Sequence, residues 1–147
     1  MSAVHPIPSS KRAPLWLTIA SGGGISWNLF GAVQFAGSVM ATPESLIAQG
    51  LTAEQAAIMT GYPVWMTLAF AVGVFGGLAG SILLLLRRPL AMPVLAASLV
   101  AYAALWVGDL VHGVFTAMGT AQVVILTVVV VIAAALFAVS RHPAAKA

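Results

Sequence analysis

Residues 64–86 form an uninterrupted apolar segment, VWMTLAFAVGVFGGLAGSILLLL, which Arg87 and Arg88 follow directly. Its 23 residues include no charged side chain. About 20 apolar residues in a helix cross the roughly 30 Å hydrocarbon core of a bilayer. We therefore expect this segment to be a transmembrane helix whose basic end lies at the membrane surface.

Three further apolar segments are long enough to cross the bilayer as helices: residues 15–40, 90–112 and 121–140. The chain is 61% hydrophobic and only 6% charged, whereas a soluble domain carries about 25% charged residues because its surface faces water. In lipid, the backbone N–H and C=O groups must be hydrogen-bonded within a helix or a closed barrel. Even the β-branched segment 121–140 is therefore expected to be helical. We predict a single all-α domain, a bundle of four transmembrane helices.

The connection at residues 42–61 is the only sizeable polar one. Thr42 precedes a proline and an acid, which is typical of a helix start, and Thr52 with Gln55 forms a capping box. Two short helical turns broken at Gly50 are expected at the membrane surface. Tyr62 and Trp65, at the start of the next span, are typical of the membrane interface. Residues 113–120 are expected to be a short connection.

The charged residues divide between two sets of segments. The basic ones fall on the two tails and the second loop: Lys11, Arg12, Arg87, Arg88, Arg141 and Lys146. The acidic ones fall on or beside the first and third loops: Glu44, Glu54 and Asp109. Because four spans put these sets on opposite sides, the positive-inside rule predicts that both termini are cytoplasmic. This topology also accounts for the net charge of +3 without nucleic acid as a partner.

The second span carries a stripe of small residues at helical spacing. Two GxxxG pairs overlap in it, and the predicted packing face is Gly73, Gly76, Gly77, Gly80 and Ser81. Small residues let transmembrane helices approach closely. This face is expected to contact another helix, either within the chain or in a homo-oligomer or a larger membrane complex.

The first span is more polar than the others. It holds a run of small residues at 21–24, where the helix could unwind, followed by Asn28 and Gln34. Asn28 lies near the middle of the span, where an unpaired amide is costly. We expect Asn28 to hydrogen-bond a neighbouring helix or to line a pathway for a small molecule.

In the third span Tyr102, Trp106 and Asp109 fall on one helical face, with His112 one turn beyond Asp109. This face could line a vestibule, and Asp109 with His112 could relay protons. The alternative is that Asp109 and His112 reach water at the end of the helix. Together with Asn28, these four residues are the candidate pathway.

Several kinds of chemistry are not expected from these residues. A bis-histidine haem site needs two histidines at one membrane level, but His5 and His142 are on the cytoplasmic side and His112 is on the other. The chain has no cysteine and no Cys/His cluster for zinc. No nucleophile–base spacing or P-loop is present. We therefore predict no catalytic residue, cofactor or metal, and no enzyme activity.

The sequence resembles a family of small bacterial four-helix membrane proteins, often labelled sugar transporters or left uncharacterised. The resemblance covers roughly residues 16–100. It is carried by Trp27-Asn28-x-x-Gly31, Thr42-Pro43-Glu44, Pro63-x-Trp65, Val74-Phe75-Gly76-Gly77-x-x-Gly80-Ser81, Arg87-Arg88, Ala91-x-Pro93-Val94 and Ser98-Leu99. It implies a multi-pass protein of the bacterial inner membrane and assigns no site residue.

Two functions remain open. The first is transport or binding of a small, sugar-like solute near Asn28, Tyr102 and Trp106. Four spans are few for alternating access, which usually needs paired repeats. The second is a non-catalytic accessory or scaffold subunit that packs its glycine face against a larger membrane complex.

Overall fold

A computed structural model describes residues 12–146, and its regular secondary structure there is entirely helical. The prediction of an all-helical fold is confirmed. The expected N-terminal tail, with His5 and Lys11, lies outside the described residues except for its last two positions.

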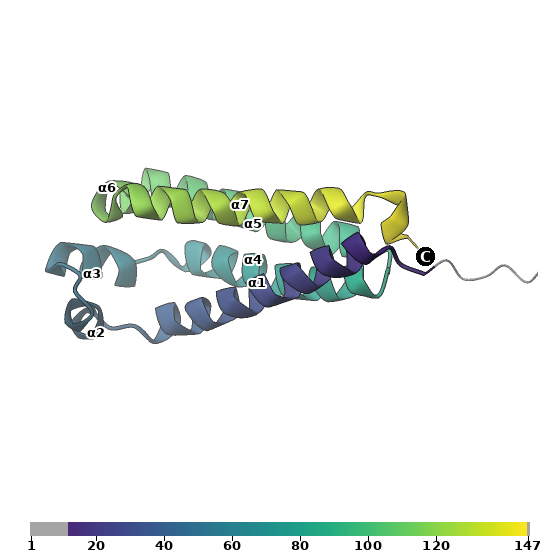
Figure 1. Ribbon diagram of the computed structural model, residues 1–147. Helices are drawn as coiled ribbons and strands as arrows, with labels where there is room; N and C mark the ends of the chain where they lie inside the picture. Colours follow the sequence, from purple (N-terminus) through teal and green to yellow (C-terminus); the bar gives the residue numbers. More distant parts are fainter. Residues whose placement is uncertain (1–11, 147) are drawn as a thin grey trace, which may run out of the picture.

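Long helices occupy the four apolar segments and run alternately up and down the molecule (Figure 1). They are α1 (Leu15–Met40), α4 (Val64–Leu85), α5 (Ala91–Val111) and α7 (Thr120–Ser140). Their bounds lie within one residue of the expected segments. The start of α1 and the C-terminal end of the described chain lie at the same end of the bundle (Figure 1).

Within the described residues, three helices are long and apolar enough to cross a membrane: α4, α5 and α7. The remaining long helix, α1, has 26 residues and would span about 39 Å at 1.5 Å per residue. Its length is sufficient, but Ser21, Asn28, Gln34 and several glycines make it less apolar. The run of small residues at 21–24 does not unwind, because α1 is continuous from Leu15 to Met40.

Short helices cover the end of the bundle where α1 ends and α4 begins. Thr42 and Thr52 each form a capping box at the start of α2 (Pro43–Ala48) and α3 (Ala53–Thr60). Gly50, with φ of 104°, lies in the break between them. The connection 113–120 is not simply a loop: it contains α6 (Val114–Met118), which begins and ends at glycines with positive φ.

The long helices pack in the order α1, α4, α5, α7, with α4 against both α1 and α5. By contrast, α1 and α7 make few contacts; they lie close together where α1 begins and diverge toward α2 and α3 (Figure 1). The buried core forms three clusters along the bundle. One, with Leu17, Leu84 and Leu136, lies near the start of α1; one, with Val74, Tyr102 and Ala133, lies near the middle; and one, with Met66 and Leu126, lies near α6.

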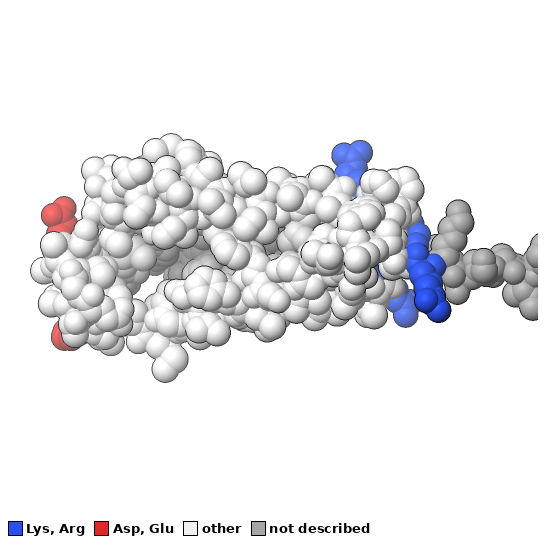
Figure 2. Space-filling model, in the orientation of Figure 1, with Lys and Arg blue, Asp and Glu red and all other residues white. Residues whose placement is uncertain are grey.

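Lys and Arg side chains gather at the end of the bundle where α1 begins and α7 ends, and the exposed Glu side chains lie at the other end (Figure 2). The expected separation of charge along the sequence is therefore a separation in space. Asp109 differs from Glu44 and Glu54, because its side chain is buried within the bundle.

The C-terminal segment folds back over the basic end. The 3-10 helix η1 (Pro143–Ala145) places Ala145 in the core cluster with Leu17 and Leu84. Arg87, which adopts a left-handed backbone with φ of 55°, donates from Nε to the carbonyl of Ala144 (3.0 Å) and from Nη2 to that of Lys146 (3.1 Å). The turn between α4 and α5 thereby holds the end of the chain in place.

Candidate functional site

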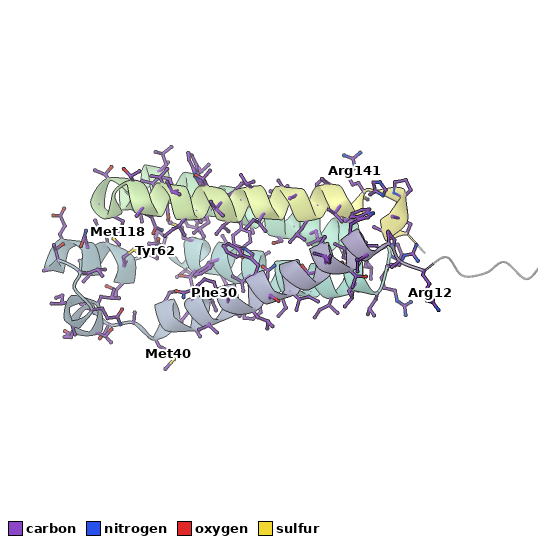
Figure 3. The ribbon with its side chains drawn as sticks, viewed as in Figure 1. Arg12, Phe30, Met40, Tyr62, Met118 and Arg141 are labelled. Carbon is purple, nitrogen blue, oxygen red and sulfur yellow. The ribbon has the colours of Figure 1, made fainter. Side chains whose placement is uncertain are left out.

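A cleft of about 470 Å³ opens where α1 and α7 diverge. Its wall includes the rings of Trp27, Phe30 and Phe70. Polar side chains also line it, and they come from α1, α5, α7 and the segment before α4: Gln34, Ser38, Tyr62, Tyr102, Asp109 and Gln122. Figure 2 shows the hollow on this face, and Figure 3 shows Phe30 and Tyr62 between α1 and α7. The cleft therefore combines aromatic surface with hydrogen-bonding groups.

Among the described residues that line the cleft, Asp109 is the one that carries a charge. It is only 1% exposed. The hydroxyl of Tyr62 donates to its Oδ1 at 3.0 Å, and Nε2 of Gln122 donates to its Oδ2 at 3.1 Å. Both donors are neutral, so the carboxylate is hydrogen-bonded at each oxygen but is not paired with a cation by these residues.

Close packing of α4 on α5 brings Tyr62 to Asp109. Gly108 precedes Asp109, and an ideal Cβ there would lie 2.7 Å from Cη2 of Trp65 and 2.9 Å from Cε of Met66. Because Gly108 has no side chain, the first turn of α4 can approach α5, and the preceding Tyr62 reaches the carboxylate. Gln122 reaches it from the first turn of α7, which the chain enters after the reversal through α6.

The hydroxyl of Tyr62 is held in its protonated form. Burial raises the pKa of this phenol, and the nearby Asp109 charge and the hydrogen bond to Asp109 raise it further. Tyr62 therefore acts as a fixed hydrogen-bond donor to Asp109 at neutral pH.

Asn28 and Tyr102 come together in the interior, where Tyr102 lies seven residues, or about two helical turns, before Asp109 along α5. Asn28 is 2% exposed; its Nδ2 donates to the Gly24 carbonyl at 2.8 Å, and its Oδ1 accepts from the Tyr102 hydroxyl at 3.5 Å. The space enclosed between Asn28, Gly77 and Ser98 has no room for a water molecule. Tyr102 lines the cleft, whereas Asn28 packs beneath it.

The structure does not bring Trp106 and His112 into the cleft. Nε1 of Trp106 donates to Thr127 of α7 at 3.0 Å, on the outer side of the α5–α7 contact. His112 is exposed and its ring lies 6.1 Å from that of Trp65. The hydrogen-bond partners of Asp109 are Tyr62 and Gln122, so the expected Asp109–His112 pair is not formed. Nor does Asp109 simply reach water at the helix end, since it is buried.

The small residues of α4 face other helices of the same chain. Ideal Cβ atoms on Gly73 and Gly80 would lie 2.6 Å from the side chains of Tyr102 and Leu95, and one on Gly76 would lie 3.4 Å from Ser98. The Oγ of Ser98 donates to the carbonyl of Gly73 at 2.6 Å. On the side toward α1, Gly77 faces Asn28 and Ser81 faces Gly24. The predicted packing face is therefore covered by α5 and α1.

Sequence reasoning missed the two partners of Asp109. The sequence identifies Tyr62 only as an aromatic residue of the membrane interface, and Gln122 lies in a span that otherwise offers almost no polar feature. The available signal was Gln122 itself, because a lone amide near the start of so apolar a helix needs a hydrogen-bond partner. Within residues 12–146, no three His, Asp or Glu side chains lie close enough together to hold a metal ion.

Comparison of the chain with protein-family models, with curated proteins and with solved structures finds no match. The family resemblance therefore stays a prediction, and the site has to be interpreted from its own geometry.

Proposed function

We propose that this protein crosses the bacterial inner membrane four times, with both termini in the cytoplasm. The three apolar helices α4, α5 and α7 support a membrane location. The proposal adds α1 as a span, because it packs along α4 and is long enough. The separation of Lys and Arg from Glu between the two ends supports the orientation by the positive-inside rule (Figure 2).

Cysteine labelling tests this topology directly, because the natural chain contains no cysteine. Glu54→Cys and Arg88→Cys each place one thiol at opposite ends of the bundle. In intact cells, a membrane-impermeant maleimide should label the first variant and should label the second only after lysis. Equal labelling of both variants in intact cells would contradict the topology.

We further propose that the protein binds a small solute in the cleft between α1 and α7 and carries it through the membrane. The observation that supports this function is the cleft itself, a hollow within the expected membrane layer with polar groups from several helices at one end. A volume of about 470 Å³ is within the range of ~300–1,000 Å³ typical of small-molecule sites. Polar groups inside a membrane domain usually mark such pathways.

Native mass spectrometry of protein gently extracted from its own membranes tests this function. We expect a monomer or small oligomer with one small molecule bound per chain. Gln34→Trp should displace that molecule, because Gln34 lines the cleft and an indole would fill it. Val33→Trp is the matched control: Val33 is the preceding residue of α1, is 68% exposed and does not line the cleft.

Two results would reject solute binding. One is a bound molecule that Gln34→Trp does not displace. The other is a stoichiometric complex with a larger membrane protein and no small molecule, which would favour the accessory-subunit hypothesis. Such a complex would have to use a surface other than the glycine face of α4, because α1 and α5 cover that face.

A further inference from the structure

We propose that the cleft binds an aromatic or otherwise lipophilic organic monocation, of the ammonium or phosphonium class, with its charge beside Asp109. This inference rests on the proposed function and names the class of solute. Three features of the cleft support it: its charge, its aromatic lining and its position.

The charge argument starts from Asp109, which is 1% exposed and hydrogen-bonded by two neutral side chains. No Lys, Arg or His is among the described residues that line the cleft. The described Lys and Arg side chains lie at the far end of the bundle (Figure 2). A buried carboxylate without a cation is strongly unfavourable in a protein interior, and a bound cation would supply the missing partner.

Each oxygen of the carboxylate has further acceptor capacity. A carboxylate offers about four lone-pair sites, and Tyr62 and Gln122 each use one. These two hydrogen bonds fix the position of Asp109 and leave acceptor sites for a protonated amine, whereas a phosphonium, which has no N–H group, would be attracted by the charge of the carboxylate alone. Asp109 is therefore both held in place and able to bind.

The lining determines which kind of cation fits. Five aromatic rings line the cleft: Trp27, Phe30, Tyr62, Phe70 and Tyr102. Aromatic faces attract organic cations by cation–π interaction within about 6 Å of the ring centre. A small, strongly hydrated metal ion would need several oxygen ligands, whereas the cleft offers one carboxylate. The volume and the rings favour a large, weakly hydrated cation.

The position of the cleft suggests how such a molecule enters. The cleft lies between α1 and α7, which make few contacts with each other and diverge along the bundle (Figure 1), and it opens on the side of the bundle (Figure 2). Asp109, Tyr62 and Gln122 are near the ends of α5, α4 and α7, while Tyr102 and Val129 lie deeper. An apolar body can therefore lie between the helices while its charge stays near the membrane surface.

Binding of tetraphenylphosphonium to the full-length protein in nanodiscs tests the inference. Tetraphenylborate has nearly the same shape and the opposite charge, so it controls for partition into lipid. We expect saturable binding of one tetraphenylphosphonium per chain and no saturable binding of tetraphenylborate. Asp109→Asn should weaken tetraphenylphosphonium binding at least about tenfold, because the asparagine has no charge. Glu54→Gln, which neutralises an exposed acid at the same end, should leave binding unchanged.

Equal affinity of the natural protein and a folded Asp109→Asn variant for tetraphenylphosphonium would overturn the inference, as would saturable binding of tetraphenylborate. If Asp109→Asn does not fold, Gln34→Trp takes its place. Loss of tetraphenylphosphonium binding in Gln34→Trp, with binding kept in Val33→Trp, places the cation in the cleft, and binding in both variants rejects it.

The same variants separate this inference from the proposed function. Suppose the natural protein does not bind tetraphenylphosphonium but retains another small molecule that Gln34→Trp displaces. The choice of a cation would then be wrong and solute binding would stand. If Gln34→Trp displaces nothing, both proposals fail.

Discussion

Asn28 of α1 occupies the space that Gly77 of α4 leaves by having no side chain. An ideal Cβ on Gly77 would approach the Oδ1, Cγ and Nδ2 atoms of Asn28 more closely than real Cβ contacts allow. The amide is thereby packed between α1 and α4, where it bonds Gly24 and Tyr102. A polar residue in the first span and a small residue in the second thus form one contact.

Gly77→Ala should lower the free energy of unfolding by about 1–3 kcal/mol, because the added methyl displaces the Asn28 amide from a closely packed site. Gly37→Ala is the control, since a Cβ on Gly37 meets nothing within 4 Å. That variant should be unchanged or up to about 1 kcal/mol more stable. Denaturant unfolding in mixed micelles measures both, and equal stability of the two variants would contradict the packing described here.

Tyr62→Phe should destabilise the protein by about 1.5–3 kcal/mol, because it removes a hydrogen bond to a charged, buried carboxylate. Tyr102→Phe removes a longer contact of 3.5 Å between neutral groups and should cost less than about 1 kcal/mol. Unfolding curves of the two variants under the same conditions provide the comparison. A larger loss in Tyr102→Phe would show that the Tyr62–Asp109 bond contributes little.

The Tyr62 phenol should remain protonated in the folded protein at pH values where a free tyrosine ionises. The chain has two tyrosines, so Tyr102→Phe leaves Tyr62 as the only phenol. Its pKa is raised by burial and by Asp109, whereas an unfolded chain ionises near a pKa of about 10. The unfolded state therefore loses the proton first, and the free energy of unfolding should fall as the pH rises above about 10.

Phenolate absorbance of that variant measures the ionisation. The folded protein should show no step near pH 10, and the same protein in denaturant should show one. A step near pH 10 while the protein is still folded would mean that Tyr62 is exposed to water.

Arg87→Ala should release the C-terminal segment. Arg87 bonds the carbonyls of Ala144 and Lys146, and a hydrogen bond from a charged group contributes about 1.5–3 kcal/mol. Hydrogen exchange of the Ala145 amide should therefore speed up about ten- to a hundredfold, while the amides in the middle of α4 are unaffected. Arg88→Ala is the control, because Arg88 is exposed. Equal exchange in both variants would indicate that the apolar contacts of Ala145 alone hold the segment.

Much of the fold could be predicted because each signal is local. The apolar segments have the length of a membrane helix. The starts of α2 and α3 follow from the capping residues Thr42 and Thr52, and Pro43 after Thr42 is a further signal. Two short elements are not predicted from the sequence: the 3-10 helix η1 (Pro143–Ala145) and α6, which has five residues between two glycines. Glycine suggests a connection from sequence alone, but here Gly113 and Gly119 take positive φ values that start and end a helical turn.

The candidate site was predicted only in part. Tyr102 and Asp109 line the cleft, but Asn28, Trp106 and His112 do not. Helical spacing identifies residues that lie on the same side of α5. That side of α5 meets both the cleft and α7, and Trp106 lies at the contact with α7. Helical spacing cannot decide which part of a face meets a neighbouring helix and which part meets a cleft.

The helices, their apolar character and the separation of basic from acidic segments can be predicted from the chain alone, since each depends on residue type and on spacing along the chain. Which helices touch one another depends instead on the packed bundle. Gly108 allows the first turn of α4 to pack closely against α5, which brings Tyr62 to Asp109. These two residues are 47 positions apart in the sequence, so their contact depends on the packing of the helices. The divergence of α1 from α7, which opens the cleft, likewise depends on how all four long helices pack together.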